Sequence, residues 1–334
     1  MTVGTTHSPG RPEGKPERAG TVLAIDGGNS KTDVLLVDSG GAVIASARSG
    51  GFTPQNSGVA AAIAVAAEAV GLIRAELAVP DGIPLARHLA AYVAGADLPV
   101  EEQALATAFM AQRWTDSVEV GNDTFALLRA GASRPWGVAV VCGAGINCAG
   151  IGPDGSRARF PALGRLTGDW GGGHYLGEEA LWHAVRAEDG RGPATALVAA
   201  VAGHFGRPTV EAVALALHFG EIENERLGEL APTLMRVAAE HDPVAVAVVD
   251  RMAEEIVTMA GVALARLRIT DRAAEIVLGG GVLRARPPAL MDRIAARAAV
   301  EIPLAELVVA ADQPVVGAAL LGLDTLGLAV ARDV

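Results

Sequence analysis

The strongest constraint on the fold is a pattern that occurs twice in the 334-residue chain. Near the start, "TVLAID", "TDVLLVD" and "AVIASAR" are short runs rich in Val, Ile and Leu, separated by turns that contain glycine. Such runs predict a meander of strands. From Trp136, "WGVAVVCGAGINCAGIGPDGSRARF" again has two apolar runs around a Gly-rich bend, with a Pro-Asp-Gly turn toward a third run. Two related units therefore follow each other along the chain.

Helices and further strands are predicted after each meander. After the first come a helix over 56–78, the strand "HLAAYVAGA", a helix over 100–113 and the strand "DSVEVGND", which ends at Asp123. After the second, helical segments fill most of 172–268, and "AAEIVLGGGVLRA", "LAELVVAAD" and "QPVVGAALLGLDTLGLAV" give strand, strand and closing helix. The predicted fold class is α/β. Two lobes are expected because a chain of 334 residues is longer than the limit of about 250 to 300 residues at which a single hydrophobic core stops growing.

Composition limits the partners. The net charge is -11 and no cluster of Lys and Arg occurs, which argues against a nucleic-acid partner. No uninterrupted apolar run of about 18 residues is present, so we expect no membrane span. Residues 1–20 are rich in Pro, Gly and charge and lack the apolar segment of a secretory signal. We expect them to form a disordered tail of a cytoplasmic protein that binds small molecules.

The only two cysteines, Cys142 and Cys148, lie close together in one apolar segment. This spacing fits neither a disulfide framework nor a zinc signature. We expect both to be buried thiols.

The first turn, "DGGNSKT", is shaped to hold an anion. Lys31 leads into a strand rather than a helix, so the turn is not a Walker phosphate loop. Gly27 and Gly28 permit positive φ and close backbone approach, so that N-H groups can bind phosphate beside the hydroxyls of Ser30 and Thr32. Before them Asp26 is a candidate to hold the waters of a magnesium ion. The alternative is an ordinary hairpin turn.

Two later glycine-rich turns fit the same ligand. "CGAGINCAG" repeats the design with Gly143 and Gly145, so that two facing loops could clamp phosphates. "LGGGVL" places Gly279, Gly280 and Gly281 between a strand and a helix, where a flat adenine ring could pack on the backbone. The alternative for each is a simple connecting turn.

The segment "VGNDTFALL" contains the acidic residue that we expect to take part in the reaction, Asp123, which follows a strand and begins a helix. Taken alone, an aspartate in this position is a helix N-cap. Beside the glycine loops, its carboxylate could instead accept a hydroxyl proton during phosphoryl transfer.

A fourth segment, "LTGDWGGGHYLGEEAL", gathers polar groups ahead of a helix. Asp169, His174, Glu178 and Glu179 are candidates to bind a sugar, because carboxylates accept hydrogen bonds from adjacent hydroxyls. The alternative for the two glutamates is a solvated helix start.

With these segments the chain resembles the superfamily of sugar kinases, actin and heat-shock chaperones. Within it, the chain is similar to the BadF/BadG/BcrA/BcrD-type branch, which holds N-acetylglucosamine kinases, glucosamine kinases and activator ATPases. The resemblance implies two ribonuclease-H-like lobes with a nucleotide and sugar cleft between them. It implies an N-terminal lobe over 21–125, joined by a returning helix over 313–330, and a C-terminal lobe over 126–312 with a helical insertion.

The resemblance also implies site residues, with Asp123 as general base, ATP and Mg²⁺ as cofactors, and a homodimer. The ATP site would comprise Gly27, Gly28, Asn29, Ser30, Lys31, Thr32, Gly143, Ala144, Gly145, Gly279, Gly280 and Gly281, with Asp26 at the metal. The sugar site would comprise Asn56, Asn122, Asp123, Asn147, Asp169, His174, Glu178 and Glu179.

Three departures from the family pattern matter. Ala144 replaces a hydroxyl residue common in hexosamine kinases, which leaves the backbone to bind phosphate. Trp170 and the acidic pair after Asp169 alter the pocket expected for the amino group. Cys142 and Cys148 lie too close together for the cluster-sharing pattern of the activator ATPases.

The function expected is ATP-dependent phosphorylation of the C6 hydroxyl of an amino sugar. Glucosamine is the expected preference, because the acidic cluster suits an ammonium better than an acetamide. N-acetylglucosamine is the alternative, and a nucleotide-driven activator of a protein partner is another. Asn56, Asn147 and Asp169 are explained by a sugar and not by such a switch. A sugar-responsive repressor would need a DNA-binding helix pair, which the N-terminal tail lacks.

Overall fold

The computed structural model describes residues 20–328, and its strands form two sheets with the same topology. The first has the order β3-β2-β1-β4-β5, with bounds β1 (Val22–Gly27), β2 (Thr32–Val37), β3 (Val43–Ser49), β4 (Ala86–Val93) and β5 (Thr115–Asn122). The second has the order β10-β9-β6-β7-β8, with bounds β6 (Gly137–Cys142), β7 (Ile146–Ile151), β8 (Arg157–Arg159), β9 (Ala274–Gly279) and β10 (Ala305–Val309). In each, an antiparallel meander continues into parallel strands. The predicted two-lobed α/β fold is confirmed.

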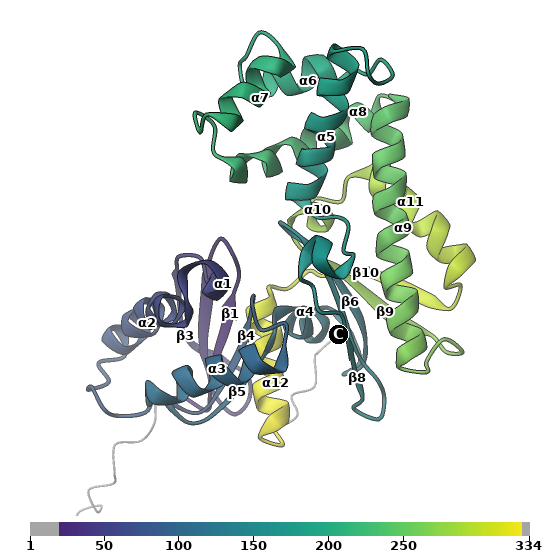
Figure 1. The fold of residues 1–334 in the computed structure, drawn as a ribbon. Helices are drawn as coiled ribbons and strands as arrows, with labels where there is room; N and C mark the ends of the chain where they lie inside the picture. Colours follow the sequence, from purple (N-terminus) through teal and green to yellow (C-terminus); the bar gives the residue numbers. More distant parts are fainter. Residues whose placement is uncertain (1–19, 329–334) are drawn as a thin grey trace, which may run out of the picture.

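Alternation along β1 explains how the first sheet is covered on both faces. Leu23 and Ile25 are buried in the core beneath α2 (Val59–Glu76) and α3 (Pro99–Ala111), whereas Val22 and Ala24 are buried in a separate cluster on the opposite face. Successive side chains of a strand point to opposite faces, so a fully apolar strand is one buried on both. A one-turn helix, α1 (Pro54–Ser57), precedes α2 (Figure 1).

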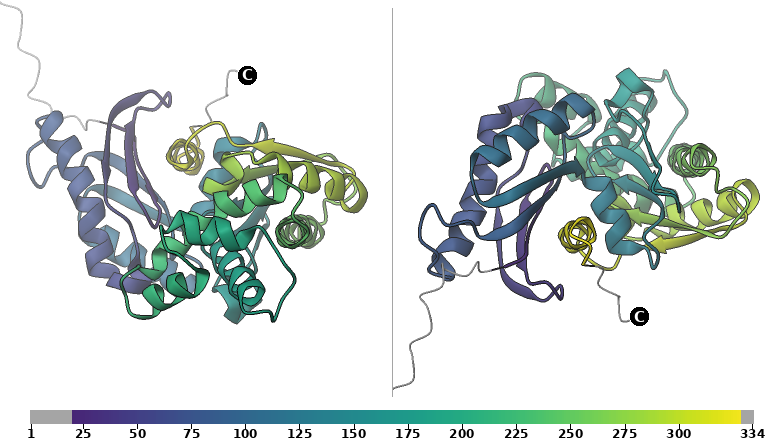
Figure 2. Two further views of the ribbon diagram at one scale, coloured as in Figure 1. Left: turned by 90° about the horizontal axis from the view of Figure 1, so that it is seen from above. Right: turned by 90° about the horizontal axis from the view of Figure 1, so that it is seen from below.

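Two helices lie between the sheets: α4 (Asp123–Gly131) and the closing helix α12 (Pro314–Thr325) (Figures 1 and 2). Close approach depends on glycine, because a side chain at Gly317 would overlap the backbone of Ala126 in α4. At Gly322 a side chain would meet Val22 of β1. The last helix in the sequence therefore packs on the first strand. Residues 1–19 of the predicted tail, and 329–330 of the predicted closing helix, lie outside the described residues.

The remaining helices belong to the second lobe. α9 (Pro243–Arg266) and α11 (Pro288–Glu301) pack together beside the second sheet, and the short α10 (Gly281–Arg284) follows β9. A helical module lies beyond the sheet (Figure 1), with bounds α5 (Gly173–Glu188), α6 (Leu197–His204), α7 (Val210–His218) and α8 (Leu230–Ala239). Across residues 20–328, no helix combines the length and apolarity that a membrane span needs.

Candidate active site

Three aspartates gather at one edge of the first sheet. β1, β4 and β5 are parallel neighbours, and Gly27, Val93 and Asn122 stand in register at their carboxyl ends. Asp26 lies at this end of β1, Asp97 follows β4, and Asp123 follows β5. In parallel sheets this edge is where ligands usually bind.

Asp123 is the first residue of α4, and the residue before it caps the helix. Asn122 Oδ1 accepts a hydrogen bond from the Thr124 amide at 3.0 Å. The N-cap alternative for Asp123 is therefore wrong, because Asn122 fills that place. Burial raises the pKa of Asp123 to about 6. Its carboxylate is thus a stronger base than an ordinary aspartate, and it is still mostly ionised at neutral pH.

Asp97 is a residue of this edge that the sequence analysis did not single out. Its Oδ1 accepts a hydrogen bond from Asn122 Nδ2 at 2.7 Å. Burial, followed by the charges of Asp123 and Glu101, raises the pKa of Asp97 to about 7. A usable signal was present, since Asp97 is an acid in the short connection between the buried strand β4, which ends at Val93, and the helix that begins at Pro99.

Asp26, the predicted metal residue, is a largely enclosed carboxylate in the same group. Burial, then the charges of Asp123 and Asp33, raises its pKa to about 7, and Lys31 opposes the shift. No cluster of three or more His, Cys, Asp or Glu side chains within 20–328 is arranged to hold a metal ion. A magnesium ion that keeps several waters and binds phosphate needs only one or two carboxylates, and Asp26 fits that role.

The first glycine loop is tighter than the sequence suggested. Gly28 N donates to Lys31 O at 2.9 Å, which closes the turn, and neither Gly27 nor Gly28 has a positive φ. Gly27 is required for another reason, because a side chain there would meet Phe52 and Val93 at 2.9 Å.

Two polar side chains of this loop are already engaged within the protein. The Thr32 hydroxyl is fully buried and donates to Gly50 O at 2.8 Å. The expectation that it binds ATP is therefore wrong, because a fully buried hydroxyl cannot be reached by a ligand. Lys31 Nζ lies 2.5 Å from an oxygen of Asp33, whose other oxygen is bound by Arg48. Burial alone would raise the pKa of Asp33, but these two cations hold it below its ordinary value.

The second glycine loop is fixed to the start of α5. Gly173 N donates to Gly143 O at 2.7 Å, and His174 N donates to Ala144 O at 3.0 Å. Gly172, with φ of +90°, allows this approach, because a side chain there would overlap the backbone of Gly145. No heavy atom lies within 4 Å of the side-chain positions of Gly143 and Gly145, so the loop presents open backbone.

The two loops meet at a cavity of about 740 Å³. The first lobe contributes Asn29, Thr53 and Asn56, and the second contributes Gly143 and Ala144. The walls further out are mainly apolar and come from α8, from α10 and from the segment between α10 and α11: Ala231, Pro232, Met235, Val282, Ala285 and Pro287. An apolar pocket next to exposed loop backbone suits a flat base joined to a phosphate chain.

The three glycines after β9 differ in what they allow. Gly279 is buried against Leu127, and Gly280, with φ of +82°, lies against the backbone of Cys142. Only Gly281 borders the cavity, and the space around its side-chain position is open. Cys142 and Cys148 are both buried, and burial raises both thiol pKa values.

The fourth polar segment is divided between places. Asp169 accepts a hydrogen bond from the Thr167 hydroxyl at 2.7 Å, and its charge makes a minor contribution to the raised pKa of Asp97, so it lies within electrostatic range of the acid edge. His174 lines the 740 Å³ cavity instead. Glu178 and Glu179 line a different hollow on α5, together with Arg165 and Trp182. His174 and Glu178 are one helical turn apart on α5 and remain neighbours, with His174 Nε2 3.5 Å from Glu178 Oε1, whereas Asp169 lies before the helix begins.

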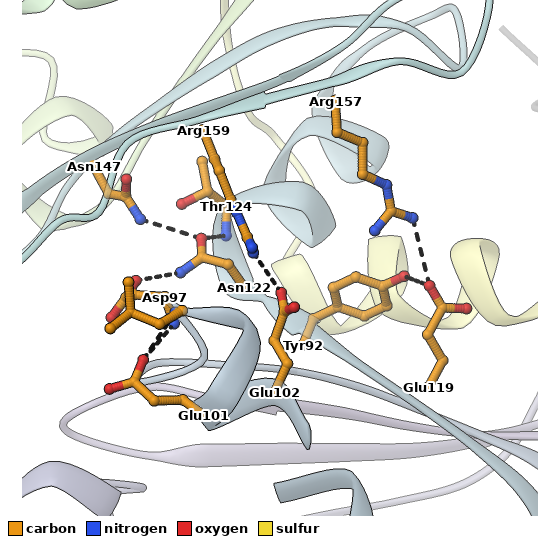
Figure 3. Close-up of polar contacts among 11 residues, drawn as sticks. Tyr92, Asp97, Glu101, Glu102, Glu119, Asn122, Thr124, Asn147, Arg157 and Arg159 are labelled. Carbon is orange, nitrogen blue, oxygen red and sulfur yellow. Dashed lines mark hydrogen bonds and ion pairs between the residues drawn. The ribbon is translucent and has the colours of Figure 1, made fainter. Parts of the chain in front are cut away.

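Asn147 connects the lobes at the acid edge. Its Oδ1 accepts the Cys148 amide at 2.7 Å, and its Nδ2 donates across to Asn122 Oδ1 at 3.2 Å (Figure 3). Asn122 itself is only 3% exposed. The predicted direct contact between Asn122 and a sugar is therefore not favoured, because the buried side chain has little surface that a sugar could reach.

The model of the BadF/BadG/BcrA/BcrD ATPase family matches residues 23–322. The chain belongs to this family. The predicted resemblance is thereby confirmed, and N-acetylglucosamine kinases are among the relatives. The N-acetyl-D-glucosamine kinase of Dictyostelium discoideum is 23% identical over 313 residues, which cover 91% of this chain and 98% of that protein.

Solved structures of sugar kinases share the fold of this family member. A candidate N-acetylglucosamine kinase from Chromobacterium violaceum has a TM-score of 0.71 at 23% identity, covering 90% of this chain and 98% of that one. A ROK family glucokinase from Streptomyces griseus, in complex with glucose and AMPPNP, has a TM-score of 0.53 at 17% identity, with coverages of 91% and 100%. The actin-like, two-lobed architecture predicted from the sequence is the one these proteins have.

Proposed function

We propose that this protein is an ATP-dependent sugar kinase that phosphorylates the C6 hydroxyl of an amino sugar, with N-acetylglucosamine as the first substrate to test. The observation that carries the proposal is the cavity where glycine loops of both lobes meet. The loop that supplies Asn29 to this cavity directly follows Asp26 of the acid edge. A nucleotide in the cavity would thus direct its phosphates toward Asp123.

Asp123 is the proposed general base. Its carboxylate would orient the sugar hydroxyl and accept its proton as the phosphoryl group is transferred. Asn147 and Asp169 border the same edge and are the proposed sugar contacts, and Asn56 would contact the substrates from the cavity wall. Closure of the lobes would exclude water, which could otherwise react with ATP in place of the sugar.

The backbone N–H groups of Asn29, Ala144 and Gly145 are proposed to bind the phosphates, because those of Gly28 and Gly143 already donate to Lys31 O and Gly145 O. If Lys31 moved away from Asp33, it would place a positive charge next to the phosphates. Asp33 would keep its ion pair with Arg48. Asp26 would hold the waters of a magnesium ion, which neutralises phosphate charge when bound. Its raised pKa supports this role, because a divalent cation would stabilise the ionised carboxylate.

The sequence alone favoured glucosamine as the substrate. Two observations now favour N-acetylglucosamine instead. The Dictyostelium relative, aligned over most of both chains, is an N-acetyl-D-glucosamine kinase. Of the acidic pair thought to attract an ammonium, Glu179 lines a hollow on α5 rather than the cavity between the loops, and Glu178 lies 3.5 Å from His174, a cation partner within the protein when that imidazole is protonated. A homodimer remains a prediction, which light scattering of the purified protein would test.

The test measures ADP release with ATP and magnesium, in the presence of N-acetylglucosamine, glucosamine, glucose, N-acetylmannosamine or no sugar. We expect N-acetylglucosamine to stimulate ADP release most strongly. Asp123→Asn keeps the size of the side chain but removes its basicity, so kcat should fall by about 10² to 10⁴-fold.

Asp81→Asn, in the exposed turn before β4, is the matched control and should behave like the wild type. Full turnover by Asp123→Asn would remove the base from the mechanism. ADP release that no sugar changes would instead favour an ATPase that activates a protein partner.

A further inference from the structure

A continuous chain of hydrogen bonds joins the two lobes at the acid edge. Asp97 Oδ1 accepts from Asn122 Nδ2 at 2.7 Å, and Asn122 Oδ1 accepts from Asn147 Nδ2 at 3.2 Å (Figure 3). Asp97 and Asn122 come from the first lobe, whereas Asn147 is on β7 of the second. The chain therefore connects the two sides of the proposed sugar site.

The bond from Asp97 determines which way the Asn122 amide points. A carboxylate is only an acceptor when ionised, so it selects the NH₂ end of the amide. The oxygen is then directed at the Thr124 amide, 3.0 Å away, and at Asn147. A flipped amide would bring its oxygen toward Asp97 and its NH₂ toward two donors.

Asn122 in turn controls two groups proposed to handle the substrate. By capping α4 it fixes the backbone at Asp123, which is the first residue of that helix. By accepting from Asn147 Nδ2 it fixes the orientation of that side chain, whose own oxygen is held by the Cys148 amide at 2.7 Å. The remaining hydrogen of the Asn147 amide group is left for a ligand.

We propose that Asp97 is a positioning residue of the sugar site, which orients Asn147 and the helix start at Asp123 through its hydrogen bond to Asn122. The inference rests on the proposed sugar-kinase function. It assigns Asn122 to the support of the site rather than to sugar contact, as its burial indicates. Loss of Asp97 should then weaken sugar use far more than nucleotide use.

The test exchanges the two partners. Asp97→Ala removes the acceptor, and Asn122→Asp removes the donor while keeping an oxygen to cap α4. Each should raise the sugar KM about tenfold, as expected for loss of a hydrogen bond to a charged group, and change the ATP KM less than about twofold. The double variant Asp97→Asn/Asn122→Asp rebuilds the bond in the opposite direction without changing net charge. It should restore the sugar KM to within about threefold of wild type.

Thermal unfolding of every variant, with exposed Asp81→Ala as the control, shows that each is folded at the assay temperature. A merely structural role for Asp97 would lower the melting temperature of Asp97→Ala and leave the sugar KM unchanged, and that result would overturn the inference. Failure of the double variant to recover beyond Asn122→Asp would overturn it as well. A wild-type protein that phosphorylates no sugar would overturn the proposed function and the inference together, whereas unaffected variants of an active wild type overturn only the inference.

Discussion

At the scale of single residues, the three aspartates of the acid edge differ in how readily they hold a proton. Burial is the largest cause for each, and the pKa is about 7 for Asp26 and Asp97 but about 6 for Asp123. The negative charge of Asp123 adds to the effect of burial at Asp26 and at Asp97, so the three carboxyls titrate as one interacting group. Separated pKa values within one group of carboxyls are typical of sites where one acid must act as the base.

The pKa of Asp123 predicts the acid limb of the pH profile. A base must be ionised to accept a proton, and the ionised fraction of Asp123 falls as the pH drops through about 6, against 3.8 for an unperturbed aspartate. We expect kcat/KM for the sugar, at saturating ATP, to begin to fall below about pH 7, as Asp97 is protonated and no longer orients Asn122, and to fall more steeply below about 6, as Asp123 is protonated too. Rates measured between pH 5 and 8, with circular dichroism to confirm folding at each pH, test this. A profile that stays flat down to pH 5 would contradict it.

At the scale of elements, the turn from β9 into α10 separates a glycine needed for folding from one needed for binding. A side chain at Gly280 would have to adopt φ of +82° and would overlap the backbone of Cys142, whereas one at Gly281 would stand in open space at the cavity wall. Gly280→Ala should destabilise the protein by about 2 kcal/mol or more.

Its neighbour provides the matched variant. Gly281→Ala should unfold at nearly the wild-type temperature but raise the ATP KM several-fold, because the added methyl group narrows the proposed adenine pocket. Thermal melts and ATP titrations of the two variants distinguish these effects. A Gly281→Ala protein with unchanged ATP KM would show that the adenine lies elsewhere.

The same elements show what could be predicted from the sequence. Apolar runs and glycine turns were sufficient for the strands of both meanders and for the two loops, because these patterns are local. The partners of side chains were not, because they depend on contacts between distant segments. Thr32 is directed at Gly50, and Asn122 rather than Asp123 caps α4. Asp97 was missed since its importance arises from Asn122, 25 residues further on.

At the scale of the whole molecule, the lobes are joined near the site by few side-chain contacts. Besides the bond between Asn122 and Asn147, Arg159 of β8 pairs with Glu102 of α3 at 2.7 Å (Figure 3). A second, more exposed pair also joins the sheets: Arg157 of β8 lies 3.5 Å from Glu119 of β5, which accepts a hydrogen bond from Thr325 of α12. The ion pair nearest the acid edge therefore links two elements that belong to different lobes.

This pair should bias the protein toward the closed arrangement in which both substrates bind. Its side chains are 32% and 24% exposed, so its contribution is on the order of 0.5 to 1 kcal/mol. Loss of the pair would lower the population of the binding-competent state, and the apparent affinities for ATP and for sugar would fall by the same factor. We expect Arg159→Ala to raise the KM values of ATP and sugar together, about two- to fivefold, with kcat unchanged. Glu102→Gln should do the same, and it leaves in place the charge of Arg159, which lowers the pKa of Asp97.

Arg297→Ala provides the control, because it removes ion pairs to Glu254 and Glu301 that lie within the second lobe. That variant should leave both KM values as they are. If Arg159→Ala or Glu102→Gln changed the sugar KM alone, the pair would act on the sugar site locally and not on lobe closure. Equal changes in the KM values of ATP and sugar would mean that the two sides of the cleft, which come from different sheets, come together in one closing step. Such a step would keep water away from ATP until the sugar is bound.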